Sequence, residues 1–494
     1  MTKKEMRQFV IRLRVLFAFV VCIGFVLIAN LFYIQVRSGD EFRTQADGQY
    51  VVSTYNSFER GSIFFEQKDG TRMSAAGQRS GYKVSINPST FSADPDLVFD
   101  TINAIHEIDK ESFFAALEKK KRTYIEIANR LSKEDGEAVK KELGKAIQLH
   151  AEKWRVYPLQ GAGAHVLGFL GFKGDDYAGR YGLERSYEET LRRTDTDVYR
   201  NFFARIFHDV RGIVDPNVDF EGDIVTTIDP QVQVFFESQI KGIQEKWSSK
   251  SSGGIIMNPQ TGEVYGLGAV PNFDNNSYGD FSINTFKNPL VENVHEMGSI
   301  MKPLIVAMAV DSGSINADTM EYYDHGFIKV GDRTIKNFDS KGRGWVKVQD
   351  ILNQSLNTGM AHIASKIPKN DFRDYFDKYG FMSKTGIDLP NEGNNLTSNL
   401  KSKRNVEFAN MSFGQGIALT PISMARALSA LGNKGKLAEP HLVKRIEYTN
   451  GLAKNISSEE ETGLQALSPE TAGKVSQMLV NVFDNYADGG YKIS

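Results

Sequence analysis

The feature that most constrains this chain is an uncharged apolar segment near its N-terminus. Residues 15–36 read VLFAFVVCIGFVLIANLFYIQV and contain no charged side chain. A helix of that length spans about 33 Å, enough to cross the roughly 30 Å hydrocarbon core of a bilayer. The sequence therefore predicts a single transmembrane helix over 15–36, because no other stretch of the chain is comparably long and apolar.

The charges before this segment predict its orientation. Five basic residues and one acid precede it: Lys3, Lys4, Arg7, Arg12 and Arg14, with Glu5. This bias places residues 1–14 in the cytoplasm and the rest of the chain on the outer face of the membrane. A cleaved signal peptide is the alternative, but it would have a shorter apolar core followed by a small-x-small cleavage site. The sequence NLFYIQVRSGDEF offers no such site.

Length, charge and cysteine content exclude several classes of function. At 494 residues the chain is long enough for two or three domains. Its net charge of −2 argues against a nucleic-acid partner, which would require a basic surface. The single cysteine, Cys22, lies in the apolar segment, so neither a disulfide, a cysteine-based zinc site nor a thiol nucleophile is expected. The eight histidines show no ligand spacing, and we expect no metal and no cofactor.

The remainder of the chain divides into two regions by pattern. Residues 37–221 are mixed, and the Ala-, Glu- and Lys-rich stretch 99–150 predicts helix. From residue 222 a strand is followed by an amphipathic helix, and residues 251–270 predict a β-hairpin around a Pro-Gln-Thr-Gly turn. Apolar helices follow. The order of strands and helices over 222–494 predicts an α+β domain.

A serine and a lysine one helical turn apart are the first candidate catalytic pair. In VHEMGSIMKPLIVAMAV, Ser299 and Lys302 stand at i and i+3, so both side chains lie on one face of a helix. Gly298 permits a tight turn into the helix, and Pro303 is tolerated only in a first helical turn. A serine hydroxyl needs an adjacent base, and a lysine serves as one if burial lowers its pKa.

This spacing has an ordinary interpretation as well. Ser299 also suits a helix N-cap and Lys302 a solvated side chain, and the same spacing occurs at residues 80–83 and 398–401. Of the three, only Ser299 is preceded by a glycine and followed by a continuous apolar helix. A second candidate pair, Ser355 and Asn357, could present a hydroxyl and an amide to a cleft from one short loop, although both residues also favour turns.

Taken together, these motifs resemble those of the class B penicillin-binding proteins, the monofunctional transpeptidases of bacterial wall synthesis, whose signature is Ser-x-x-Lys, Ser-x-Asn and Lys-Thr-Gly. The likeness extends over nearly the whole chain after the apolar segment. It includes ERGSIFFEQKDG (59–70), YGLERSYEETL (181–191), TTIDPQVQ (226–233) and FGQGIALTPISMARALSALGNKG (413–435). One departure is Met297, where the family usually has proline before Gly-Ser.

The resemblance implies an architecture and roles for individual residues. It implies a transmembrane helix, an elongated pedestal (dimerisation-type) domain over 37–221 and a penicillin-binding/transpeptidase domain of the serine β-lactamase-like fold over 222–494. Ser299 would be the acylated nucleophile, Lys302 the general base, Ser355 a proton relay and Asn357 a substrate contact. Arg60 and Glu184 fall in the pedestal and are expected to be structural.

The triplet Lys384-Thr385-Gly386 is not expected to be the third motif. It precedes GIDLPNEG, which is rich in turn residues, and matches a connecting segment of the family. The resemblance places the true triplet on a strand after the last helix, near 468–483, and the chain ends at Ser494 before reaching it. We therefore expect a chain truncated at its C-terminus that lacks the last strands of the domain, leaves a strand edge exposed and is poorly active.

The predicted function is peptidoglycan D,D-transpeptidation in a bacterium, by a single-pass protein of the cytoplasmic membrane. Its partners would be peptidoglycan stem peptides, β-lactams as inhibitors, and membrane proteins of the division or elongation machinery. Two alternatives remain open: a β-lactamase or β-lactam sensor with the same motifs, and a non-catalytic scaffold of a wall-synthesis complex. A β-lactamase would lack the membrane segment and the pedestal.

Overall fold

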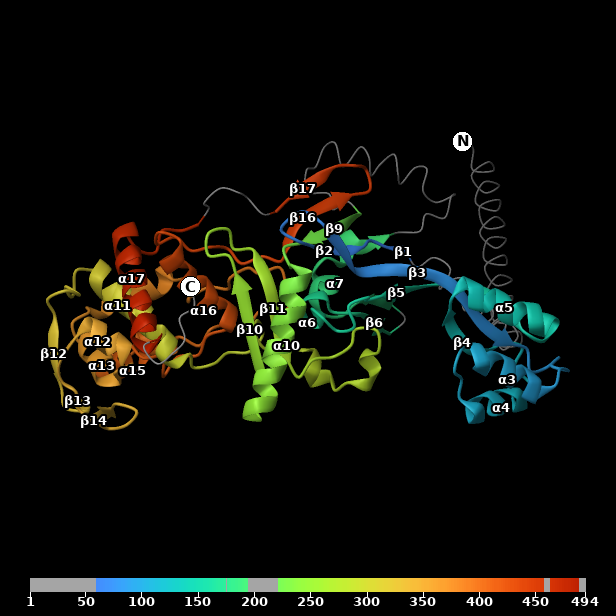
Figure 1. The fold of residues 1–494 in the computed structure, drawn as a ribbon, viewed down its shortest axis with the longest axis horizontal. Coiled ribbons are helices and arrows are strands. Elements are labelled where there is room, and N and C mark those ends of the chain that lie inside the picture. The colour runs from blue at the N-terminus through green and yellow to red at the C-terminus, as the bar shows by residue number, and fades with distance from the viewer. Residues whose placement is uncertain (1–58, 175, 194–220, 457–462, 488–494) are drawn as a thin grey trace, which may run out of the picture. The chain divides into compact units, whose positions relative to one another are not determined.

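A computed structural model describes residues 59–174, 176–193, 221–456 and 463–487 (Figure 1). The predicted transmembrane helix at 15–36 lies outside the described residues. Among those that are described, no helix has the length and apolar character needed to span a membrane.

The chain forms two compact units, each made of segments that are not consecutive in the sequence. Among the described residues, one unit comprises Glu59 and Arg79–Trp154, and the other comprises Arg60–Gln78 and the residues from Arg155 onward. Strand β3 (Arg72–Ile86) contributes residues to both. The boundary predicted at 221/222 is not where the compact division falls, because β2 (Ile63–Glu66) pairs with β9 (Gly222–Thr226) within the second unit.

The first unit is an α/β module with its own core. Its helices are α3 (Pro95–Ile105), α4 (Lys110–Glu118) and α5 (Lys133–Leu143), and β4 (Ile125–Leu131) and β5 (Gln148–Val156) pair with β3. Helix over the whole of 99–150 was therefore a wrong prediction, because β4 and the start of β5 are strands. In β4 the β-branched Ile125 and Ile127 alternate with polar residues and pack against the core, which favours a strand at a sheet edge.

In the second unit a sheet brings together strands from both ends of the chain. β16 (Val443–Tyr448) pairs with β9 and with β17 (Ala453–Asn455), and β9 pairs in parallel with β2. Beside this sheet, Glu184 of α7 (Gly182–Ser186) is fully buried and binds both Arg60 (2.6 Å) and Arg155 (2.7 Å). Burial alone raises the pKa of Glu184, but the two guanidiniums outweigh burial and hold that pKa below its ordinary value.

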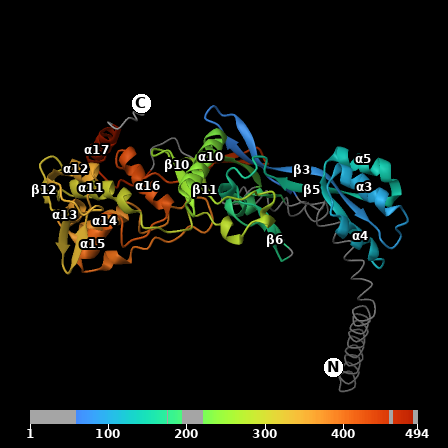
Figure 2. The same ribbon diagram turned by 60° about the horizontal axis from the view of Figure 1, so that its bottom comes forward.

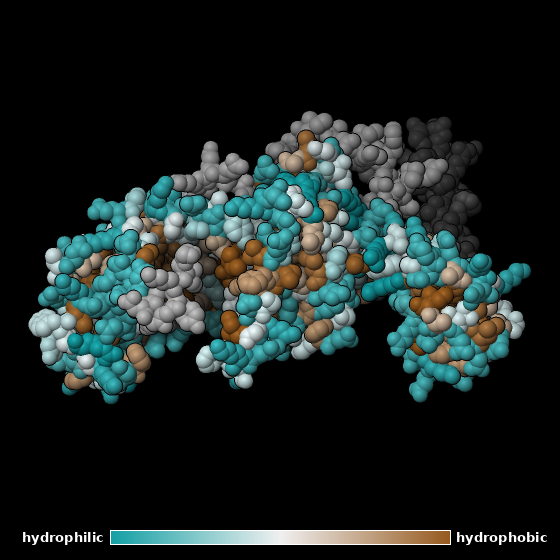
Figure 3. Space-filling view, viewed as in Figure 1, coloured by the Kyte–Doolittle hydropathy of each residue, from teal (hydrophilic) through white to brown (hydrophobic). Residues whose placement is uncertain are grey.

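The predicted hairpin is present and packs against a long helix. β10 (Ser252–Met257) pairs with β11 (Val264–Val270), and Gly262, at φ 83°, closes the turn. Helix α10 (Pro230–Trp247) begins after Asp229, whose carboxylate caps it by accepting from two backbone N–H groups. Within the described residues β10 has no strand partner besides β11. Figure 3 shows hydrophobic surface around this hairpin.

The remaining elements of the second unit form a helical lobe with a large apolar core. Its helices are α11 (Lys302–Asp311), α12 (Val348–Asn353), α13 (Asn357–Ala364), α14 (Lys369–Lys378), α15 (Asn405–Met411), α16 (Pro421–Gly432) and α17 (Pro469–Ala487). Between α11 and α12 lie two antiparallel strand pairs: β12 (Glu321–Asp324) with β15 (Gly344–Lys347), and the hairpin of β13 (Phe327–Val330) with β14 (Arg333–Lys336). Figures 1 and 2 both show these helices gathered around α11. Every residue of α11 from Leu304 to Ala309 is buried, which makes it the central helix of the lobe.

Candidate active site

Ser299 lies in a tight turn that leads into α11. Gly298 has a φ of 61°, which glycine adopts without strain, and Ser299 follows it in a 3₁₀ turn over Gly298–Met301. The α-helix then begins at Lys302 with Pro303 in its first turn, as the sequence predicts. The turn is held by the segment after α15, because Gly298 N–H donates to the Gly414 carbonyl (3.1 Å).

The structure brings all four predicted site residues together. The Nζ of Lys302 donates to three oxygens: the Ser355 carbonyl at 2.6 Å, the Ser355 Oγ at 2.9 Å and the Asn357 Oδ1 at 2.9 Å. The Ser355 hydroxyl in turn lies 3.0 Å from the Ser299 Oγ. Hydrogen bonds thus connect Ser299 to Lys302 through Ser355, over sequence separations of more than 50 residues.

Burial lowers the pKa of Lys302 and so enables its amine to accept a proton. Lys302 is only 2% exposed, whereas Ser299 is exposed to solvent. Removing the ammonium from water lowers the pKa of Lys302 from 10.5 to about 8. At neutral pH a useful fraction of the amine is therefore unprotonated and able to accept a proton, which a solvated lysine could not offer.

Ser355 occupies an uncommon backbone conformation. Its φ of 52° lies in the left-handed region, which costs energy for a residue with a side chain. This geometry directs both the carbonyl and the hydroxyl of Ser355 toward the Lys302 amine, and the next helix, α13, begins two residues later at Asn357. Local strain is therefore found where the polar groups of the site converge.

The other Ser-x-x-Lys matches and the Lys-Thr-Gly triplet lie in other elements of the fold. Ser80 and Lys83 belong to β3, and Ser398 and Lys401 to a 3₁₀ turn over Ser398–Lys401. Lys384-Thr385-Gly386 is not in a strand: Glu392 accepts from the Thr385 N–H (2.6 Å) and the Gly386 N–H (3.1 Å), while Lys384 is exposed. The triplet is thus a turn held by Glu392, and it takes no part in the hydrogen bonds that join the four site residues.

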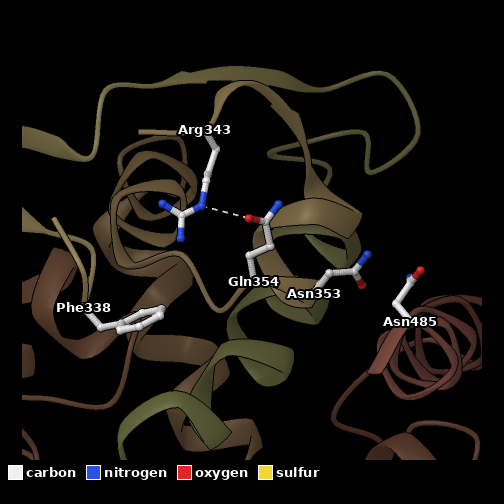
Figure 4. A pocket seen from close by; sticks show the side chains of 5 residues that line it. All are labelled: Phe338, Arg343, Asn353, Gln354 and Asn485. Carbon is white, nitrogen blue, oxygen red and sulfur yellow. Dashed lines mark hydrogen bonds between the residues drawn. The ribbon is translucent and has the colours of Figure 1, made fainter. Parts of the chain in front are cut away.

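A polar cavity of about 430 Å³ opens beside the site. Its lining side chains are Phe338, Arg343, Asn353, Gln354 and Asn485, and Gln354 directly precedes Ser355 in the chain (Figure 4). Figure 4 shows Arg343 facing Gln354, to which its Nε donates at 2.9 Å. Amide and guanidinium groups around such a space suit the carbonyl and carboxylate groups of a peptide. No sequence pattern predicts this lining, because Phe338 and Arg343 belong to no motif.

Within the described part of the chain, no cluster of three or more histidine, cysteine or acidic side chains could hold a metal ion. The chemistry available at the site is that of a hydroxyl, an amine and an amide. A serine activated through a hydroxyl relay by a buried lysine can attack a carbonyl and become acylated.

Two family models match the chain in succession. The penicillin-binding protein dimerisation domain matches residues 58–201, and the penicillin-binding protein transpeptidase domain matches residues 253–494. Stage V sporulation protein D of Bacillus subtilis is 26% identical over 96% of this chain and 73% of its own length. A peptidoglycan D,D-transpeptidase FtsI homolog of Mesostigma viride is 28% identical over 93% of this chain and 79% of its own.

A solved structure shows the same fold. Penicillin-binding protein 2X from Streptococcus thermophilus superposes with a TM-score of 0.67 at 22% sequence identity. The match covers 86% of this chain and 65% of that one.

Proposed function

Because this chain belongs to the class B penicillin-binding proteins, we propose that it is a serine D,D-transpeptidase in which Ser299 carries the acyl group. The observation that supports this role is the connected set Ser299–Ser355–Lys302, with its buried amine and exposed nucleophile. Asn357 is proposed to contact the substrate, and the substrate class is the peptidoglycan stem peptide.

In the first half-reaction, the Ser299 Oγ attacks the carbonyl carbon between two terminal D-alanines. The Ser299 proton passes to Ser355, and Ser355 passes its own proton to the Lys302 amine. Collapse of the tetrahedral intermediate breaks the peptide bond and returns a proton along the same route to the leaving D-alanine amine. An ester between Ser299 and the donor stem remains.

In the second half-reaction, the amine of a neighbouring stem attacks this ester. The amine loses a proton toward Lys302, a new peptide bond forms, and the Ser299 hydroxyl is restored. The first step converts an amide into an ester and the second converts that ester into an amide, so overall one amide bond is exchanged for another and the balance needs no energy source. A β-lactam, whose ring amide takes the place of the scissile bond, would leave Ser299 acylated.

The role of Ser299 is tested by labelling membranes with a fluorescent penicillin. Wild type should give a covalent band that disappears in Ser299→Ala and persists in Ser398→Ala, which alters the serine of a competing Ser-x-x-Lys spacing. Mass spectrometry of the labelled protein should place the adduct on Ser299. A non-catalytic scaffold would show no band that depends on Ser299, and rapid loss of the adduct in water would instead indicate a β-lactamase.

The membrane location is a further part of the proposal, supported by the sequence. The uncharged segment 15–36 after a basic N-terminus would anchor the chain with its bulk outside the cytoplasm, where partner membrane proteins of division or elongation would act with it. Protease added to intact spheroplasts should digest the chain after residue 36. Protection of the whole chain until the membrane is broken would contradict this orientation.

A further inference from the structure

Three buried polar side chains lie behind Asn357. Asp324, at the end of β12, is 1% exposed, Asn337, just after β14, is 3% exposed, and Thr358 in α13 is fully buried. The Asp324 Oδ2 accepts from the Asn337 Nδ2 at 2.8 Å, and its Oδ1 lies 2.8 Å from the Thr358 hydroxyl and accepts from the Gly326 N–H. A buried carboxylate is tolerated only with such partners, so the three groups constrain one another.

This cluster caps α13 from another part of the chain. The first N–H groups of a helix lack intrahelical acceptors, and Leu356, which precedes the helix, has no polar side chain to supply one. The Thr358 N–H instead donates to the Asn337 Oδ1 at 3.2 Å. The negative charge of Asp324 close to the same helix N-terminus also suits the helix dipole.

The strand end that carries Asn337 also orients the amide of Asn357. Lys336, the neighbour of Asn337, uses its carbonyl to accept from the Asn357 Nδ2 at 3.3 Å. The Oδ1 of Asn357 therefore faces the Lys302 Nζ, which donates to it at 2.9 Å. Were the strand end around Lys336 to move, the amide could turn and bring its NH₂ group against the lysine amine.

We infer that Asp324, Asn337 and Thr358 form a positioning unit that holds Asn357, and through it the Lys302 amine, in the geometry needed for acylation. The inference rests on the proposed function, since it concerns how the same site is held. None of the three touches the reacting hydroxyl, so they are positioning residues. Misalignment of the site by a fraction of an ångström should slow acylation by a larger factor than it weakens the initial binding of the ligand, to which Asn357 contributes.

The test measures the acylation rate constant and the dissociation constant of the non-covalent complex separately, with a chromogenic penicillin and the full chain in detergent. Asp324→Asn replaces one carboxylate oxygen by an NH₂ group, which faces a donor in either orientation of the amide, the Asn337 NH₂ or the Gly326 N–H, so the unit opens. We expect the rate constant to fall about tenfold with the dissociation constant within twofold of wild type. The reciprocal pair Asp324→Asn with Asn337→Asp exchanges donor and acceptor and should recover part of the rate, because the Asn337 Nδ2 also donates to the Lys341 carbonyl at 3.2 Å and an aspartate cannot.

Two further comparisons keep the outcome independent of folding. Thr358→Val removes the hydroxyl at nearly constant shape and should be slow, whereas Thr358→Ser retains it and should be close to wild type. Asp332→Asn alters an exposed carboxylate in the turn between β13 and β14, which lies 3.9 Å from both Arg333 and Arg404, and should leave the rate unchanged. A lower melting temperature with an unchanged rate constant in Asp324→Asn and Thr358→Val would overturn the inference, as would a change confined to the dissociation constant. Absence of Ser299 acylation in the wild type would instead overturn the proposed function, and the inference with it.

Discussion

At the scale of single residues, the pKa of Lys302 sets the pH range in which Ser299 can be acylated. Burial lowers this pKa to about 8, so the unprotonated, proton-accepting form grows as the pH rises toward and past that value. We predict that the second-order rate constant of penicillin acylation rises with pH and is half-maximal near pH 8. Lys302→Arg stays charged at every accessible pH and should lower the rate by about 10²-fold or more. Stopped-flow acylation from about pH 6 to about pH 10 measures both.

Lys384→Arg serves as the control, because Lys384 is exposed and belongs to the triplet that lies outside the site. Its profile should match that of wild type. A flat profile in wild type, or a normal rate in Lys302→Arg, would contradict the assignment of Lys302 as the base.

At the scale of elements, the turn into α11 depends on a close approach between two backbones. A Cβ on Gly414 would lie 2.2 Å from the Gly298 carbonyl oxygen, and Gly414 itself has a φ of 77°. We predict that Gly414→Ala lowers the free energy of unfolding by about 1–3 kcal/mol and displaces Ser299, with a matching loss of acylation. Urea unfolding and penicillin labelling of the same preparation measure the two effects.

Gly473→Ala is the matched substitution. Gly473 is an exposed residue of α17, and a Cβ there meets nothing within 4 Å. Alanine should increase stability by about 0.5–1 kcal/mol, because it favours helix over the unfolded chain, and labelling should be unchanged. Equal effects of the two substitutions would show that the contact with Gly298 is not what matters at Gly414.

At the scale of the whole molecule, the two compact units have separate stabilising centres. Glu184 pairs with two buried guanidiniums in the second unit, and one of them, Arg60, also binds Glu188. Val139, by contrast, is a fully buried residue of the first unit's apolar core. We predict that Glu184→Gln destabilises the second unit by about 3–5 kcal/mol, since Arg60 and Arg155 would keep their charge without their shared partner. Val139→Ala should destabilise only the first unit, by about 1–3 kcal/mol. Differential scanning calorimetry should show two transitions, each lowered by one substitution, and a single transition lowered by both would contradict this independence.

Features that depend only on neighbouring residues could be predicted from the amino-acid sequence. Gly298, Pro303 and the spacing of Ser299 and Lys302 specify the turn, the helix start and the shared face, because all lie within one helical turn of each other. The hairpin at 251–270 and the capped start of α10 follow from local turn and cap chemistry in the same way. The turn residues after Lys384 likewise excluded a strand there. The resemblance of the motifs then indicated the family, which the two family models confirm.

Features that depend on contacts between distant residues became visible in the folded structure and could not be predicted from local sequence. Ser355 and Asn357 meet Lys302 across separations of 53 and 55 residues, and the lowered pKa of Lys302 comes from the packing around it. Asp324 and Asn337 belong to no motif, so no local pattern marks them as the cap of α13. The formation of β4, within the stretch predicted to be helical, also depends on a contact with another part of the chain. Its residues form a strand because the edge of β3 supplies the backbone hydrogen bonds that the segment alone cannot make.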